Sequence, residues 1–177
     1  LFYSAFTYFL GFQINEGEYK LMGLASYGKP KFYDLILDKL IDVKKDGSIH
    51  LDMSYFAFTH DKVMTNEKFS KLFGLKPRQK NEPPQQIHFD IGASAQKVLE
   101  TVILKMVHHV HSKTKMKNLC LGGGVALNGV ANYKIMKEGP FENIHIPPSP
   151  GDAGSAAGAA QYLYNVYHKN PKNTLDN

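Results

Sequence analysis

The order of helices and strands predicted between residues 91 and 167 restricts the possible folds of this chain more than any other feature of its sequence. A long helix is indicated by apolar side chains that recur on one helical face, at positions 91, 95, 98, 99, 102, 106 and 110. Two short apolar runs follow, at 119–121 and 144–146, and a turn and a helix come after each. Such alternation is typical of parallel strands joined by right-handed crossovers. The sequence therefore predicts an α/β fold with a small sheet flanked by helices.

Two loops stand at the carboxyl ends of these predicted strands, the first of which suits a buried strand. One is Gly122-Gly123-Gly124, and the other ends at Asp152, in the position of a helix N-cap. If the strands are neighbours in the sheet, both loops face one crevice, where ligands bind in open α/β sheets. Asn128 is expected about one turn into the helix that follows the glycines.

The first half of the chain is less regular. Helical spacing or apolar runs indicate helices over 1–12, 18–24, 32–40 and 67–73. Asp46-Gly47 predicts a hairpin turn between strands at 41–43 and 49–53. Residues 76–86 are polar and contain prolines, so we expect an exposed loop there, and we expect a flexible tail over 169–177.

Composition favours one domain spanning residues 1–177, because 43% of the 177 residues are hydrophobic, enough for one sizeable core. The net charge of +5 comes from scattered side chains, which suggests tolerance of anionic ligands and no nucleic-acid surface. Cys120 is the only cysteine, so we expect no internal disulfide and a reducing, cytoplasmic compartment. No apolar run approaches the roughly 20 residues of a membrane span, and no leader opens the chain. A start without Met, inside an apolar stretch, suggests a piece excised from a longer polypeptide.

The candidate site residues have both functional and structural interpretations. Successive glycines let backbone amides approach an anion or a ribose, but they also make tight connections; neither GxGxxG nor a P-loop is present. Asn128 could present its amide to a base or phosphate, or be an ordinary polar residue near a helix start. Asp152 could bind a hard cation, or only cap a helix.

Other side chains carry weaker signals. The spacing of His108, His109 and His111 argues against a metal site and favours a partly solvated helix end. The alanine stripe after Asp152 favours close helix packing. Lys20 and Lys29 flank a glycine turn and could meet phosphate.

The chain contains three motifs in order, at residues 18–30 (EYKLMGLASYGKP), 121–128 (LGGGVALN) and 147–160 (PPSPGDAGSAAGAA). Together they resemble the carbamoyltransferase family of nodulation factor and antibiotic biosynthesis. The resemblance covers nearly the whole chain and is weakest over 41–86. It implies the later part of an amino-terminal domain similar to tRNA threonylcarbamoyl-transfer proteins, with the actin, sugar-kinase and Hsp70 type of ATPase fold (ribonuclease H-like). This chain would be the second of its two lobes.

The resemblance also implies an activity. Carbamoyl phosphate and ATP would give carbamoyl adenylate at a separate carboxy-terminal domain, and this domain would pass the carbamoyl group to a hydroxyl of a sugar or small-molecule acceptor. The first lobe and the carboxy-terminal domain are missing partners, so we expect the isolated piece to bind nucleotide weakly and to be inactive. Neither a membrane nor nucleic acid is an expected partner.

The same resemblance assigns site residues. Gly122, Gly123, Gly124 and Asn128 would touch the nucleotide, and Gly28 would approach the ribose. Asp152 would be catalytic as a ligand of a divalent metal, iron or magnesium, whose other ligands include a His-x-x-x-His pair earlier in the full protein. Lys20 matches a motif position and is grouped with the cofactor-binding residues without a defined role.

Three alternatives remain open. A non-catalytic nucleotide-binding lobe would bind ATP without metal dependence. A kinase or a threonylcarbamoyl-transfer protein of the same superfamily would differ in its product. A nucleic-acid-binding module would show a salt-dependent affinity for oligonucleotides.

Overall fold

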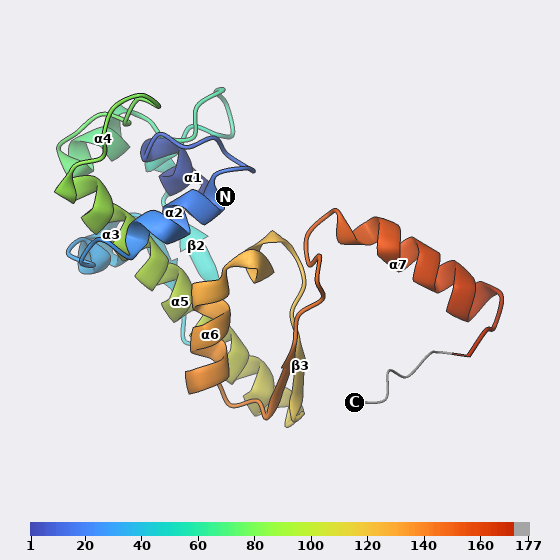
Figure 1. Ribbon diagram of the computed structural model, residues 1–177. Helices are drawn as coiled ribbons and strands as arrows, with labels where there is room; N and C mark the ends of the chain where they lie inside the picture. Colours follow the sequence, from blue (N-terminus) through green and yellow to red (C-terminus); the bar gives the residue numbers. More distant parts are fainter. Residues whose placement is uncertain (172–177) are drawn as a thin grey trace. The chain divides into compact units, whose positions relative to one another are not determined.

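The computed structural model describes residues 1–171, which divide into two compact units (Figure 1). The first unit comprises residues 1–115 and 130–140, and the second comprises 116–129 and the chain from 141 onward. The single sizeable core that the composition predicts lies entirely in the first unit, so one core does not organise the whole chain. The tail predicted over 169–177 lies outside the described residues from position 172 on.

The first unit is mainly helical, with one small hairpin. Its elements are α1 (Phe2–Phe9), α2 (Glu18–Ala25), α3 (Tyr33–Lys39), β1 (Ile41–Val43), β2 (Ile49–Leu51), the 3-10 turn η1 (Met53–Tyr55), α4 (Glu67–Phe73), α5 (Gln86–Thr114) and α6 (Gly129–Glu138). The predicted hairpin is confirmed: β1 and β2 pair antiparallel, and Gly47 takes φ +85° in the turn, a region that favours glycine. The predicted helix at 67–73 is confirmed as well, capped by the Asn66 side chain, which accepts a hydrogen bond from the Phe69 N–H at 3.2 Å.

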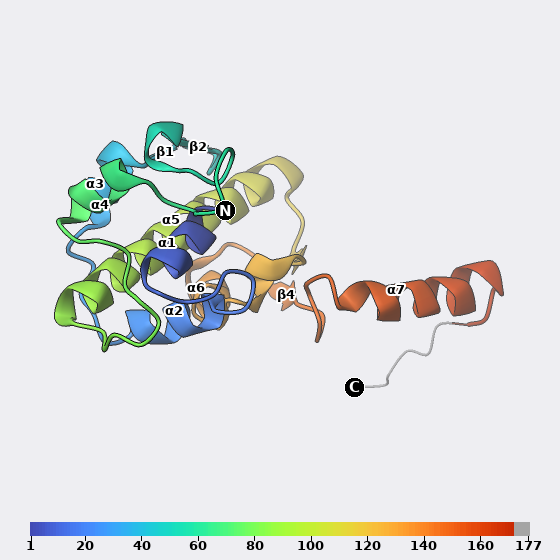
Figure 2. The same ribbon diagram turned by 90° about the horizontal axis from the view of Figure 1, so that it is seen from above.

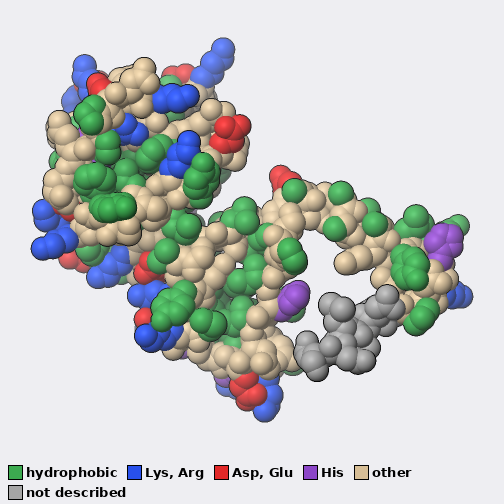
Figure 3. Space-filling view, viewed as in Figure 1, with side chains coloured by type: hydrophobic (Ala, Val, Ile, Leu, Met, Phe, Trp, Pro, Cys, Tyr) green, Lys and Arg blue, Asp and Glu red, His purple; other side chains and the backbone are tan. Residues whose placement is uncertain are grey.

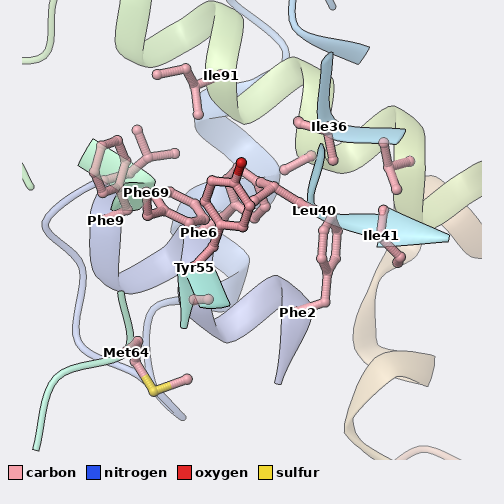
Figure 4. Packing of buried hydrophobic residues seen from close by; sticks show 14 of the residues in the cluster. Phe2, Phe6, Phe9, Ile36, Leu40, Ile41, Tyr55, Met64, Phe69 and Ile91 are labelled. Atoms are coloured by element: carbon pink, nitrogen blue, oxygen red, sulfur yellow. The ribbon is translucent and has the colours of Figure 1, made fainter. Parts of the chain in front are cut away.

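Aromatic rings from α1 and α4 form the centre of the core (Figure 4). The Phe69 ring lies 4.9 Å from Phe9 and 5.3 Å from Phe6 between centroids, and both contacts are edge-to-face. Phe73 adds a third neighbour at 5.1 Å. Aromatic pairs at these distances and angles are favourable beyond the area they bury. All four side chains are less than 5% exposed, so this cluster anchors the first unit.

The long helix α5 is the surface on which α1, α2 and α3 pack (Figure 2). Four of its predicted apolar positions, Ile91, Ala95, Val98 and Val102, are buried. The last predicted position, Val110, is 44% exposed, because the helices that cover α5 contact its amino-terminal part. The predicted helix face is therefore right over its first half only.

The predicted loop at 76–86 is irregular up to Gln85, and its side chains are largely exposed apart from Arg78. Arg78 is 8% exposed because its Nε donates to the carbonyl of Leu10 at 2.7 Å and its backbone N–H donates to the carbonyl of Phe9 at 2.9 Å. These bonds tie the loop to the end of α1. A polar loop sequence carries no signal for such a buried arginine.

The second unit contains the predicted parallel strands. Its elements are β3 (Asn118–Cys120), the 3-10 turn η2 (Gly124–Leu127), β4 (Asn143–His145), α7 (Gly154–Tyr162) and a π-turn (Leu163–Tyr167). β3 and β4 pair parallel, in register from Asn118 opposite Asn143 to Cys120 opposite His145, which confirms the predicted strand neighbours. No other strand of residues 1–171 joins this pair.

Two predictions for the second unit are wrong. The first strand was expected to be buried, but β3 exposes Asn118 and Cys120, and β4 is the only strand of the described residues that lies beside it. The alanine stripe was expected to mark close helix packing, but within residues 1–171 α7 buries no side chain, and it carries exposed apolar groups (Figure 3). None of the described helices has the length and apolar character needed to cross a membrane.

Candidate functional site

The two strand-end turns meet. The Gly123 N–H donates to the Pro150 carbonyl at 2.6 Å, and two residues earlier the Leu121 N–H donates to the His145 carbonyl at 3.0 Å. Because β3 and β4 are parallel neighbours, the glycine turn and the 147–152 turn emerge at the same edge of the pair. The predicted adjacency of the two turns is therefore confirmed.

The three glycines of the first turn differ in what requires them. Gly123 has φ +91° and ψ 166°, a conformation essentially restricted to glycine. Gly122 and Gly124 have no such φ, and a Cβ added to either would meet nothing within 4 Å. Neither backbone strain nor packing within the described chain calls for glycine at these two positions. Their open sides leave room for a ligand to approach the backbone.

The backbone amides of this turn are available to a ligand. Among residues 1–171, the N–H groups of Gly122 and Gly124 donate to no protein acceptor. The α-helix expected directly after the glycines is replaced by η2, and α6 begins only at Gly129. Any attraction for an anion therefore comes from exposed amides in a glycine turn, and the dipole of an α-helix does not act at this position.

Asn128 lies between η2 and α6, and not one turn inside a helix as predicted. Its backbone has φ −77° and ψ 91°, and its N–H donates to the Val125 carbonyl at 3.0 Å. The residue is only 8% exposed. A ligand could therefore reach no more than a small part of Asn128.

Asp152 is exposed and does not cap the helix. The N-cap of α7 is Ala153, and the backbone carbonyl of Asp152 accepts hydrogen bonds from the N–H of Ser155 at 3.1 Å and from its hydroxyl at 2.6 Å. The predicted capping role was wrong because the helix begins later and the carbonyl, in place of the carboxylate, accepts the Ser155 N–H. The Asp152 carboxylate is thus left for another partner.

A metal centre needs more ligands than Asp152 supplies. Across residues 1–171, no three His, Cys, Asp or Glu side chains come together closely enough to hold an ion. The described part of the chain therefore does not fit a metal site by itself. At the end of α5, His108 is exposed and His109 and His111 are half-buried, as expected for a partly solvated helix end.

The remaining predicted site residues, Lys20 and Gly28, belong to the first unit. Lys20 is exposed, with its Nζ 5.7 Å from the ring centroid of Tyr19. A Cβ on Gly28 would lie 2.0 Å from the Phe89 carbonyl oxygen, so the backbone of Gly28 packs directly on α5. Gly28 thus has a structural reason to be glycine that does not depend on a ribose.

The similarity of this chain to a known protein family decides its assignment. A family model described as carbamoyltransferase N-terminus matches residues 1–161. The chain belongs to the carbamoyltransferase N-terminus family. The resemblance stated from the three motifs is thereby confirmed.

Relatives within the carbamoyltransferase N-terminus family align along almost the whole chain. An uncharacterized protein of Synechocystis is 51% identical over 172 residues, which are 97% of this chain and 28% of that protein. Nodulation protein NolO of Bradyrhizobium diazoefficiens is 35% identical over 90% of this chain and 27% of its own length. Nodulation protein NolNO of Sinorhizobium fredii is 32% identical over 93% of this chain and 22% of its own. The chain spans about a quarter of the length of these relatives.

The motifs of this carbamoyltransferase N-terminus chain did not single out Asp90, but the structure shows it bonded to the backbone of the 18–30 motif. Its side chain, on α5, is 4% exposed, and its Oδ2 lies 2.7 Å from the Nζ of Lys31. Its Oδ1 accepts hydrogen bonds from the Lys29 N–H and from the Gln86 Nε2, both at 2.9 Å. Burial raises the pKa of Asp90, but Lys31, the Lys29 N–H and Gln86 outweigh it and lower that pKa to about 2. One sign of this residue is present in the sequence: Asp90 is an acid that stands next to the apolar face predicted for the long helix.

Replacing Asp90 with asparagine is expected to remove a pH-dependent part of the stability. A carboxyl with pKa about 2 when folded and 3.8 when unfolded stabilises the protein by roughly 2 kcal/mol above its unfolded pKa, and this is lost as pH falls toward about 2. In denaturant unfolding, the free energies of unfolding of wild type and Asp90→Asn should differ most at about pH 6. This difference should shrink between about pH 4 and pH 2. A difference that stays constant over that range would show that ionised Asp90 is not the source.

An open groove of about 540 Å³ lies on the far half of α5 within the first unit. It is lined by Lys45, Thr101, Leu104, Lys105, His108, His109, Ser112, Lys134 and Glu138. None of the predicted site residues lines this groove. Of the lysines that line it, Lys134 already forms ion pairs. Its Nζ lies 3.4 Å from a carboxylate oxygen of Glu100 and 3.7 Å from one of Glu138.

Proposed function

We propose that this chain is part of an O-carbamoyltransferase, and that the joined turns of β3 and β4 hold the adenylate part of the carbamoyl donor. The carrying observation is the glycine turn: two amides without a protein acceptor, on glycines with open space beside them, are held against the Asp152 turn. Amides in this arrangement suit phosphate oxygens. Membership in the carbamoyltransferase N-terminus family supports the chemistry.

The proposed reaction transfers a carbamoyl group to oxygen. The acceptor hydroxyl oxygen forms a bond to the carbamoyl carbon, the bond from that carbon to the adenylate phosphate oxygen breaks, the hydroxyl proton is lost, and AMP leaves. Hydrogen bonds from Gly122 and Gly124 would stabilise the charge that gathers on the departing phosphate. ATP and carbamoyl phosphate would supply the adenylate elsewhere in the intact protein.

The remaining predicted residues keep their proposed roles. Asp152 would give one oxygen ligand to a divalent ion, iron or magnesium, whose other ligands lie elsewhere in the intact protein. Gly28 would approach the ribose, and Lys20 would lie near the nucleotide. Asn128 would contact it only through its small exposed part. The proposed architecture is one lobe of an actin, sugar-kinase and Hsp70 type of ATPase fold.

The test is an assay of the intact protein with ATP, carbamoyl phosphate, a divalent metal and a panel of hydroxyl-bearing acceptors. We expect AMP release that depends on both carbamoyl phosphate and an acceptor, and that falls at least about 100-fold in Asp152→Ala. The matched control is Asp61→Ala, another exposed aspartate, which should retain activity. ATP binding without any AMP release would favour a non-catalytic nucleotide-binding lobe.

A further inference from the structure

The segment between α2 and α3 has no regular structure, yet its backbone is held at three points. Gly28 packs on the Phe89 carbonyl, with no space for a Cβ. The Lys29 N–H donates to Asp90 at 2.9 Å. The Phe32 N–H donates to the Ser94 hydroxyl oxygen at 2.9 Å, and that hydroxyl donates in turn to the Asp90 carbonyl at 2.6 Å. All three anchors come from consecutive turns of α5.

The side chains on this fixed backbone point to a binding role. Tyr27 is 74% exposed, Lys29 is exposed, and the Lys31 side chain is 59% exposed although it pairs with Asp90. An aromatic ring and a cation therefore stand in solvent on a turn that cannot rearrange freely. Lys29 has no ion pair among the described residues, so its ammonium group is available to an anion.

Stability alone does not require this arrangement. Only the Asp90 side of its pair with Lys31 is buried, and a buried charge can often be replaced by an apolar side chain together with its partner without loss of stability, because desolvation offsets the attraction. A carboxylate that accepts the N–H of the loop does something an apolar side chain cannot: it fixes the position of the loop backbone. A loop ordered before binding loses less conformational freedom when the ligand arrives.

We propose that Asp90 is a positioning residue, which holds the turn at 27–31 so that the Lys29 ammonium meets a phosphate group of the substrate. This inference rests on the proposed function. The adenine nucleotide is the phosphate-bearing ligand that the proposed function places in this domain, so its phosphate is the group that Lys29 meets. The group that would recognise this phosphate is an exposed ammonium on a turn that is ordered before binding.

The test uses four variants of the intact protein. Asp90→Ala removes all the bonds of the carboxylate, and Asp90→Asn keeps one oxygen that can accept from the Lys29 N–H. Lys29→Met removes the proposed phosphate contact and leaves the backbone anchors in place. Met64→Ala is the stability control, because Met64 is 6% exposed in the same core and contributes nothing to the turn.

Two quantities are measured for each variant. Hydrogen exchange of the Lys29 amide without substrate reports whether the turn is held. In the AMP-release assay, KM and kcat are determined separately for ATP and for carbamoyl phosphate, at a temperature where every variant is folded. The KM for ATP reports the proposed contact, and the KM for carbamoyl phosphate serves as the comparison.

We expect Asp90→Ala to speed exchange at Lys29 and to raise the KM for ATP about tenfold, with kcat within about twofold, since one lost phosphate contact is worth about a factor of ten. Asp90→Asn should give a smaller rise. Lys29→Met should raise the same KM without a change in exchange, and Met64→Ala should change neither. This pattern separates positioning from general destabilisation.

Unchanged KM values in both Asp90 variants, with faster exchange at Lys29, would overturn the positioning role. So would unchanged KM values in Lys29→Met. A wild-type protein that releases no AMP under any condition is a different failure, because it would refute the proposed function.

Discussion

Alanine in place of Phe69 is expected to lower the free energy of unfolding by about 3–5 kcal/mol, the usual cost of emptying a buried phenylalanine site. The Phe69 side chain is fully buried, and its ring contacts those of Phe6, Phe9, Phe56 and Phe73. Because α1 and α4 meet through this ring, little of the surrounding structure can collapse into the cavity. A typical domain is stable by about 5–15 kcal/mol, so the loss is a large fraction of the total.

Denaturant unfolding of the intact protein measures this effect, as a lower midpoint with an unchanged slope. Tyr19→Ala is the matched control, because Tyr19 is 64% exposed and its loss should change stability by less than about 0.5 kcal/mol. If Phe69→Ala proved no more harmful than Tyr19→Ala, the aromatic cluster would not be the centre of the core.

Valine in place of Gly123 is expected to weaken ATP binding to the intact protein about 100-fold. The backbone conformation of Gly123 costs a non-glycine residue on the order of 1–3 kcal/mol, so the turn would take another shape. The amides of Gly122 and Gly124 would then lose their alignment on a phosphate, and one or two charge-assisted hydrogen bonds are worth about 3 kcal/mol.

Titration calorimetry with ATP measures the affinity directly. Gly158→Ala is the control from the same unit, because Gly158 lies in a helix and an added Cβ would meet nothing within 4 Å. It should bind ATP as the wild type does. Equal affinity in Gly123→Val would mean that the glycine turn does not form the nucleotide site.

Local patterns predicted much of the fold. The hairpin at Asp46-Gly47, the helix at 67–73 and the parallel neighbours β3 and β4 all follow from spacing within a few residues, and all are confirmed. The adjacency of the two strand-end turns follows from the parallel pairing. These features depend on short-range periodicity and on turn chemistry, which a sequence displays directly.

Long-range contacts could not be predicted in the same way. Asp90 bonds to a residue 61 positions away, and Arg78 bonds to one 68 positions away. The exposure of Cys120 on β3 and of the alanine stripe on α7 also depends on what covers those surfaces, which apolar composition alone does not reveal. Asp152 was misplaced as a cap because a shift of the N-cap by one residue, to Ala153, changes which group meets the Ser155 N–H.

Hydrogen exchange at the glycine turn, with and without ATP, tests the central claim most directly. The amides of Gly122 and Gly124 have no acceptor within the described chain, so they should exchange quickly in the free intact protein. With ATP bound, as checked by calorimetry, both should slow at least about tenfold, because phosphate oxygens become their acceptors. If ATP binds and the exchange of both amides stays as fast as before, the nucleotide lies elsewhere and the account is wrong.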